Sequence, residues 1–119
     1  PFEPSIPAQE AALAAIDDEN HLRKTIKLNH QEKTTIQNAL NLLKVKYISS
    51  ETNFITLIFN NKHESILFTE NMLKLGIIVR NLESFGLPEC VRVTIGTKKE
   101  NNIYIKSLNT VLKNIHEKI

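Results

Sequence analysis

The sequence of 119 residues has no tryptophan, one cysteine and only three glycines. The single cysteine, Cys90, excludes an internal disulfide and a zinc site built on cysteine pairs, and it fits a reducing cytoplasm. Gly76, Gly86 and Gly96 form neither G-x-G-x-x-G nor a phosphate-binding P-loop. No apolar run approaches the roughly 20 residues of a membrane-spanning helix. These absences predict a cytoplasmic protein that does not span a membrane.

Strong charge of either sign is also lacking. Fifteen basic and thirteen acidic residues give a formal net charge of +2, and the lysines are scattered among the acids. Neither a basic stripe nor an aromatic platform is visible, so no nucleic-acid partner is expected. The four histidines have no metal-ligand spacing, and no serine follows the G-x-S-x-G pattern. The residues alone therefore predict no metal site and no catalytic residue within this chain.

What is present is an unusual placement of arginine. Only three arginines occur, and two of them, Arg80 and Arg92, lie in the stretch GIIVRNLESFGLPECVRVTIGT. Apolar residues predict strands over Ile77–Val79 and Val91–Ile95, and alternation separates Arg92 from the valines beside it. One interpretation is a paired-arginine site for a phosphate or carboxylate, because a guanidinium binds such anions through two hydrogen bonds. The other is a solvated edge strand with incidental charges, and spacing leaves both open.

Cys90 immediately precedes the second of these strands, and its thiol also has two interpretations. Proximity to Arg92 would lower the pKa of the thiol and activate it. A small buried apolar side chain is the alternative that this residue type favours.

The first part of the chain predicts an extended arm and a short helix. Three of the four prolines fall within residues 1–7, which excludes regular helix there. Ser5 is placed to cap a helix that Pro7 opens, and the alanine-rich residues 8–16 continue it. Such a short helix is marginal alone in water, so we expect it to need a large partner surface.

A second, long helix follows. Asp17 or Asp18 is expected to cap it, and it runs to about Leu43. Its 4-3 stripe is apolar at both ends and polar in the middle: Leu22, Ile26, Asn29, Lys33, Ile36, Leu40 and Leu43. At 1.5 Å per residue the helix is about 39 Å long, whereas a domain of this size has a radius of gyration of about 13–14 Å. We therefore expect it to extend beyond its own domain.

The remaining segments predict the order ββαββα and an α+β fold. Strands over 45–48 and 53–59 form a hairpin. Asn60-Asn61 ends the second strand and is placed to cap a helix over 62–75, which ends at Gly76. After the two arginine strands, the capping box Thr97–Glu100 opens a helix to about Lys118. Its expected buried stripe is Ile103, Leu108, Val111, Leu112 and Ile115. The prediction is a helical arm and long helix, followed by a small, mostly antiparallel or mixed sheet packed on helices.

The sequence motif of the arginine stretch resembles that of one enzyme family, the histidinol-phosphate aminotransferases. These are class I/II aminotransferases that use pyridoxal phosphate on the fold-type-I scaffold. Their pattern joins G-[IV]-[IV]-V-R, a loop ending in G-L-P and [VL]-R-[VI]-T-[IV]-G-T. SSETNFITLIF at 49–59 and PFEPSIPAQEAALAAIDD at 1–18 are similar to two further family stretches. The resemblance covers essentially the whole chain, but only the last third of such an enzyme.

The resemblance implies the C-terminal small domain, which closes over the substrate. The Schiff-base lysine and the other pyridoxal phosphate ligands of the family lie upstream, and none of the twelve lysines here has the S-x-x-K context. Alone, the chain is expected to bind no cofactor and to be inactive. Residues 1–17 would pack on the missing N-terminal large domain, and residues 18–119 would form the small domain. The full-length enzyme is expected to be a homodimer.

The resemblance also assigns substrate-binding residues. Arg92 matches the family arginine that receives the α-carboxylate of glutamate or the substrate phosphate. Arg80 matches a second arginine that helps bind the phosphate of histidinol phosphate, and Asn53 is given a supporting role. Two departures from the family pattern bear on which substrate is bound: Asn81 stands where the family commonly has proline, and Glu83 adds negative charge to the loop.

Two alternatives remain. One is a standalone α+β module that binds small anions or a partner protein without catalysis. The other is the same domain of a related pyridoxal phosphate enzyme, such as a threonine-phosphate decarboxylase or an aromatic aminotransferase.

Overall fold

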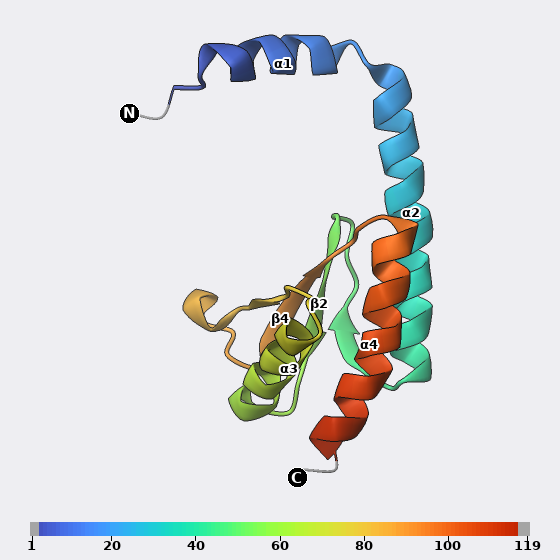
Figure 1. Cartoon of the computed structure of the whole chain (residues 1–119), viewed down its shortest axis with the longest axis vertical. Coiled ribbons are helices and arrows are strands. Elements are labelled where there is room, and N and C mark those ends of the chain that lie inside the picture. Colours follow the sequence, from blue (N-terminus) through green and yellow to red (C-terminus); the bar gives the residue numbers. More distant parts are fainter. Residues whose placement is uncertain (1–2, 117–119) are drawn as a thin grey trace.

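The computed structural model describes residues 3–116, and within this range it confirms an α+β fold (Figure 1). The sheet has the strand order β1-β2-β4-β3, and every neighbouring pair is antiparallel. The helices are α1 (Ile6–Ile16), α2 (Glu19–Leu42), α3 (Lys62–Lys74) and α4 (Lys98–His116), with a 3-10 turn η1 (Glu83–Phe85). The strands are β1 (Lys46–Ile48), β2 (Phe54–Ile58), β3 (Arg80–Asn81) and β4 (Cys90–Thr94).

One face of the sheet packs on the helices and forms the core. Alternate residues of the two central strands, Ile55 and Leu57 on β2 and Val91 and Val93 on β4, are buried and belong to one apolar cluster with residues of α2, α3 and α4. Burial of such side chains is the dominant favourable term in folding. The intervening residues lie on the other face, which we call the open face.

Local capping signals fix where most helices begin and end. The Asp18 carboxylate accepts a hydrogen bond from the His21 amide at 2.9 Å, and the Asn61 side chain accepts one from the Glu64 amide at 3.0 Å. Gly76 closes α3 with φ of 76°, a conformation that glycine adopts without strain. The Thr97–Glu100 capping box is also formed. These predicted boundaries are confirmed.

Three details of the prediction are wrong. Ser5 stands at the start of α1, but its side chain makes no capping hydrogen bond. Residues 77–79 are not a strand, because the Ile77 amide bonds the Met72 carbonyl at 3.0 Å and finishes the turn after α3; pairing begins only at Arg80. Ile103 is 49% exposed, and Tyr104 replaces it in the core because it lies one turn before Leu108 on the same face of α4.

The N-terminal part of the molecule stands clear of the rest (Figure 1). Every residue from 6 to 28 is exposed, and the first buried residue of α2 is Glu32. We call residues 6–28 the overhang and residues 29–116 the body. The Cα radius of gyration is 16.9 Å, above the about 13–14 Å of a compact domain this size. The long helix therefore does extend beyond its own domain.

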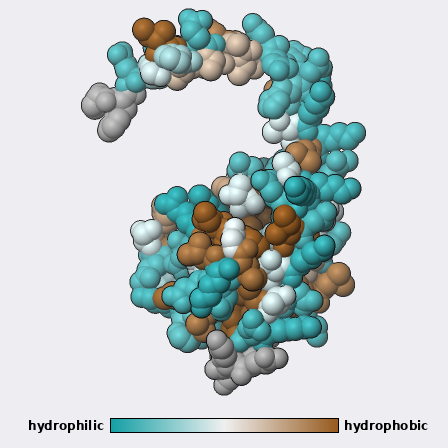
Figure 2. All heavy atoms as spheres, viewed as in Figure 1, coloured by the Kyte–Doolittle hydropathy of each residue, from teal (hydrophilic) through white to brown (hydrophobic). Residues whose placement is uncertain are grey.

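Apolar surface is exposed on both parts (Figure 2). On the overhang it comes from Ile6, Leu13, Ile16, Leu22, Ile26 and Leu28. No helix within residues 3–116 has the length and apolarity needed to cross a membrane. The first two residues of the predicted arm and the predicted helix end at Lys118 lie outside the described residues.

Candidate anion site

The sheet register brings Arg80 and Arg92 directly opposite each other. Arg80 of β3 is the Cα partner of Arg92 of β4, and Arg92 in turn is paired with Thr56 of β2. In the strands Val91 and Val93 face the core, so Arg92 lies on the open face. Side chains that are directly opposite have Cβ atoms about 4.5–5.5 Å apart, and like charges placed so are destabilising. Two cations on adjacent strands are therefore an arrangement that an anion would stabilise.

Each guanidinium lies over a phenylalanine ring. The Cζ atom of Arg92 is 5.2 Å from the centre of the Phe54 ring, and that of Arg80 is 4.8 Å from the centre of the Phe85 ring. Both distances are within the about 6 Å at which a cation is attracted to the face of an aromatic ring. No sequence pattern indicated these two phenylalanines as site residues. Strand register is the signal that points to Phe54, but the contact with Phe85 depends on the fold of the loop after β3.

Glu83, the acidic residue in the loop after β3, has its own partner. It forms an ion pair with Lys62, at the start of α3. About half of each side chain is exposed, so this is a surface contact. The negative charge that Glu83 adds near the arginines is thus offset locally.

Asn81, one of the two departures from the family pattern named above, links β3 to α3. Its amide nitrogen donates to the Ser65 hydroxyl at 3.0 Å, and its oxygen accepts from the Glu83 amide at 2.8 Å. Ser65 is fully buried, and its hydroxyl also bonds the Pro88 carbonyl at 2.6 Å. Asn81 therefore fixes the loop that carries Phe85, a job that a proline side chain cannot do.

The third predicted site residue, Asn53, is not brought together with the arginines. It directly precedes Phe54 and is exposed, and its carbonyl accepts a hydrogen bond from the Ile95 amide at 2.8 Å. It lines a hollow between α2 and the beginning of α4, together with Ile26, Asn29 and Glu100 among others. Its supporting role in substrate binding stays a prediction.

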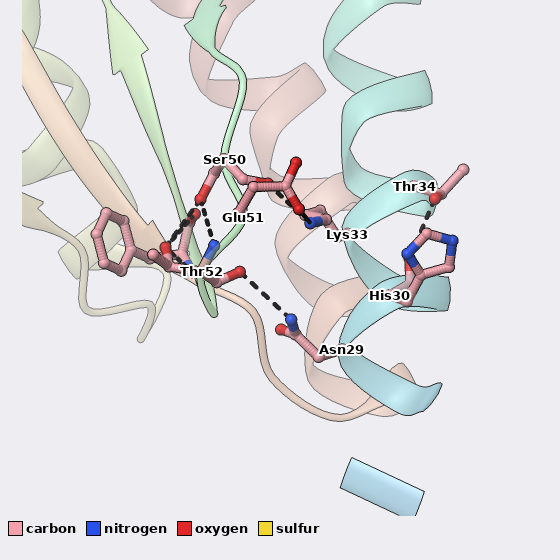
Figure 3. A network of polar contacts seen from close by, with 8 residues as sticks. Asn29, His30, Lys33, Thr34, Ser50, Glu51 and Thr52 are labelled. Carbon is pink, nitrogen blue, oxygen red and sulfur yellow. Dashed lines mark hydrogen bonds and ion pairs between the residues drawn. The ribbon is translucent and has the colours of Figure 1, made fainter. Parts of the chain in front are cut away.

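The turn before Asn53 is fastened to α2 by polar contacts (Figure 3). Lys33 donates to the Ser50 carbonyl at 2.7 Å and lies 3.7 Å from the Glu51 carboxylate, while the Asn29 side chain donates to the Thr52 carbonyl at 3.3 Å. Thr52 and Ser50 also bond each other through their hydroxyls at 2.8 Å. These contacts fix the β1–β2 turn, and with it the start of β2.

Cys90 is buried on the strand that carries Arg92, and it is 3% exposed. Burial raises the pKa of its thiol above the ordinary value, and the neighbouring Glu89 carboxylate raises it further. The structure therefore agrees with the favoured interpretation, a small buried apolar side chain, and not with an activated thiol.

Comparison with known proteins identifies the family. The family model described as aminotransferase class I and II matches residues 1–108. The chain belongs to this family. It is 40% identical over 113 residues to a histidinol-phosphate aminotransferase of Campylobacter jejuni, which covers 95% of this chain and 30% of that protein. It is 37% identical over 116 residues to "histidinol-phosphate aminotransferase 2" of Legionella pneumophila, covering 98% of this chain and 30% of that protein.

Solved structures agree on the fold. The histidinol-phosphate aminotransferase of Sinorhizobium meliloti, solved in complex with pyridoxal 5'-phosphate, superposes with a TM-score of 0.82 at 19% identity. The match covers 88% of this chain and 29% of that chain. The chain spans about 30% of the length of the curated relatives it matches.

The residues that the structure describes do not by themselves fit the pyridoxal phosphate that the family implies. A Schiff base needs a free amine in a protected site. Among residues 3–115 the one buried lysine is Lys33, and its amine is already bonded to Ser50 and lies near Glu51. Across the described residues, no three His, Cys, Asp or Glu side chains gather as a metal site would require. What the open face presents is two arginines on paired strands.

Proposed function

We propose that this chain is the C-terminal small domain of a pyridoxal-phosphate-dependent histidinol-phosphate aminotransferase. In that enzyme it would recognise the phosphate and carboxylate groups of the substrates. The observation that carries the proposal is the direct pairing of Arg80 with Arg92 on the open face. An enzyme that exchanges amino groups between glutamate and imidazole-acetol phosphate must accept a carboxylate and a phosphate in alternate half-reactions. Two adjacent guanidinium groups bind either anion.

The contribution of this chain is to bind and orient. Arg92 is half-buried on a central strand of the sheet, so it presents its N–H donors from a fixed backbone. Arg80, on the edge strand, is more exposed and adds a second donor set. The cofactor, when bound by the longer protein, supplies the electron sink for amino transfer. Holding the anionic end of the substrate converts a bimolecular encounter into a positioned reaction.

The remainder of the enzyme would supply the lysine and cover the overhang. Residues 1–17 are proposed to pack on an N-terminal large domain, and residues 18–119 to form the small domain of a homodimer. The exposed apolar side chains of Leu13 and Ile16, each more than 60% exposed, support this division. Apolar surface of this kind is typical of an interface.

The test uses the full-length protein, assayed for amino transfer from glutamate to imidazole-acetol phosphate. We expect activity there and none from the 119-residue chain with added pyridoxal phosphate. In the full-length protein Arg92→Lys should lower kcat/KM by about 10- to 100-fold with little change in thermal stability, because an ammonium cannot replace a bidentate fork worth about 1.5–3 kcal/mol. Unchanged kinetics would remove Arg92 from the site.

A matched control is available in the overhang. Arg23 is exposed and pairs with Glu19 at 3.2 Å within one helix, so Arg23→Lys should leave kcat/KM unchanged. Decarboxylation of threonine phosphate, or transfer to an aromatic substrate instead, would assign the domain to one of the related enzymes. A chain that sediments as a monomer and binds no dye for exposed apolar surface would favour the standalone module.

A further inference from the structure

The two rings that hold the arginines lie toward opposite ends of the paired strands. Phe54 is the Cα partner of Thr94, two residues beyond Arg92 on β4. Phe85 lies in the opposite direction, since it follows Asn81 on the chain and Asn81 is paired with Val91. The backbones place Arg80 and Arg92 face to face, but each guanidinium lies over a ring from a different part of the chain.

Stacking on a ring is compatible with binding an anion. A guanidinium that lies over an aromatic face uses its own flat face, and its N–H donors point outward in its plane. The ring restricts the long arginine side chain, which otherwise loses considerable rotamer entropy when it binds. The negative face of the ring also attracts the positive charge that lies over it.

The exposure of Phe85 is a second, independent observation. This ring is 59% exposed and does not belong to the buried core cluster. Its loop is nevertheless fixed, since the Phe85 amide bonds the Leu82 carbonyl at 2.9 Å and Gly86 closes the turn with φ of 78°. An exposed aromatic side chain on a fixed turn, placed against an arginine, contributes to that arginine rather than to core packing.

We propose that Phe54 and Phe85 are positioning residues of the anion site, each holding one guanidinium on its ring so that its edge N–H groups remain free for a phosphate or carboxylate. This inference rests on the proposed function of the open face. It adds that the two arginines are separated donors with preset orientations, rather than one flexible pair.

The experiment follows the side-chain Nε–Hε signals of the arginines by NMR in the labelled 119-residue chain, with inorganic phosphate as the probe. The chain has three arginines, and Arg23 in the overhang is an internal control. Ring currents should shift the Arg80 and Arg92 signals upfield of Arg23 before phosphate is added. Phosphate should then move the Arg80 and Arg92 signals together and leave Arg23 in place.

Phe85→Leu keeps an apolar side chain but removes the aromatic face. We expect the Arg80 signal to lose its upfield shift and phosphate to bind roughly two- to fivefold more weakly, which corresponds to about 0.5–1 kcal/mol. Phe85→Tyr should restore both, and an unchanged backbone amide spectrum in both variants excludes unfolding. Phe54→Leu should act in the same way on Arg92.

The outcomes separate the two proposals. A wild-type chain whose Arg80 and Arg92 signals ignore phosphate would overturn the proposed anion recognition, and the positioning role with it. A wild-type chain that responds, with equal or tighter binding in Phe85→Leu and Phe54→Leu, would overturn the positioning role alone. In that case the rings would be bystanders or would withhold the arginines from the anion.

Discussion

The overhang and the body both contain leucine and isoleucine but are stabilised in different ways. In the body, residues distant in sequence meet, as when β2 of the first hairpin pairs with β4. In the overhang, the side-chain contacts are local. The Gln9 side chain bonds the Pro4 carbonyl, and the Asp18 carboxylate accepts from the His21 amide. Arg23 contacts Asn20 and Glu19 on the same helix. The leucines and isoleucines of the overhang are exposed. Apolar residues in this sequence therefore form two kinds of surface, one buried within the chain and one exposed to solvent.

The largest expected difference between the two regions is the cost of removing a leucine. Leu57 is fully buried, so Leu57→Ala should lower the free energy of unfolding by about 2–5 kcal/mol. Leu13 is 62% exposed, and Leu13→Ala should change the free energy of unfolding by no more than about 0.5 kcal/mol. Denaturant unfolding of the 119-residue chain measures both. A large effect of Leu13→Ala would show that α1 is packed in solution, for instance against a second copy.

The next effect concerns the place where α2 enters the body. The Asn101 amide nitrogen donates to the buried Glu32 carboxylate at 2.9 Å and to the Gly96 carbonyl at 2.9 Å, while its oxygen accepts from the Gly96 amide at 3.0 Å. Asn101→Ala leaves these groups without their partner and should cost about 1–3 kcal/mol. The neighbouring Asn102 is exposed, so Asn102→Ala is the matched control. Equal effects in denaturant unfolding would mean that the buried contact adds nothing to stability.

The sequence predicted well what short-range chemistry determines. Asp18, Asn61 and Gly76 mark helix boundaries through groups within three or four residues, and all three appeared where expected. The length of α2 alone predicted that the helix extends beyond its domain. The sequence motif shared with the family indicated Arg80 and Arg92, which the strand register places opposite each other.

Long-range relations were less accessible. Whether Ile103 or Tyr104 faces the core depends on how α4 sits on the sheet, which a helix pattern alone does not specify. Asn53 directly precedes β2, and only the pairing of β2 with β4 shows that Phe54, not Asn53, lies near Arg92. The stacking of Arg80 on Phe85 depends on a turn fixed by Asn81 and Ser65, which meet only in the folded chain.

A helix cap should have different consequences in the two regions. Thr97 caps α4 in the body, and Thr97→Ala should lower global stability by about 1 kcal/mol. Asp18 caps α2 in the overhang, and Asp18→Ala should reduce helicity near residue 19 without changing global unfolding, because that turn frays separately. Circular dichroism gives the helicity and hydrogen exchange locates the loss. If Asp18→Ala lowered global stability as much, the overhang and the body would unfold as one unit.

The smallest expected effect is a dependence on pH that belongs to the body. Hydrogen bonds from the Thr97 amide and hydroxyl, each 2.7 Å, lower the pKa of the Glu100 carboxyl below its usual value of 4.5. A carboxyl whose pKa is lower in the folded state stabilises the fold above its unfolded pKa, and this contribution is lost as the pH falls through the folded value. Wild-type chain should therefore lose slightly more stability than Glu100→Gln between about pH 6 and pH 3. Glu70→Gln, at an exposed position on α3, is the control and should behave like the wild type. A parallel pH profile for wild type and Glu100→Gln would mean that the capping box does not depend on the charge of Glu100.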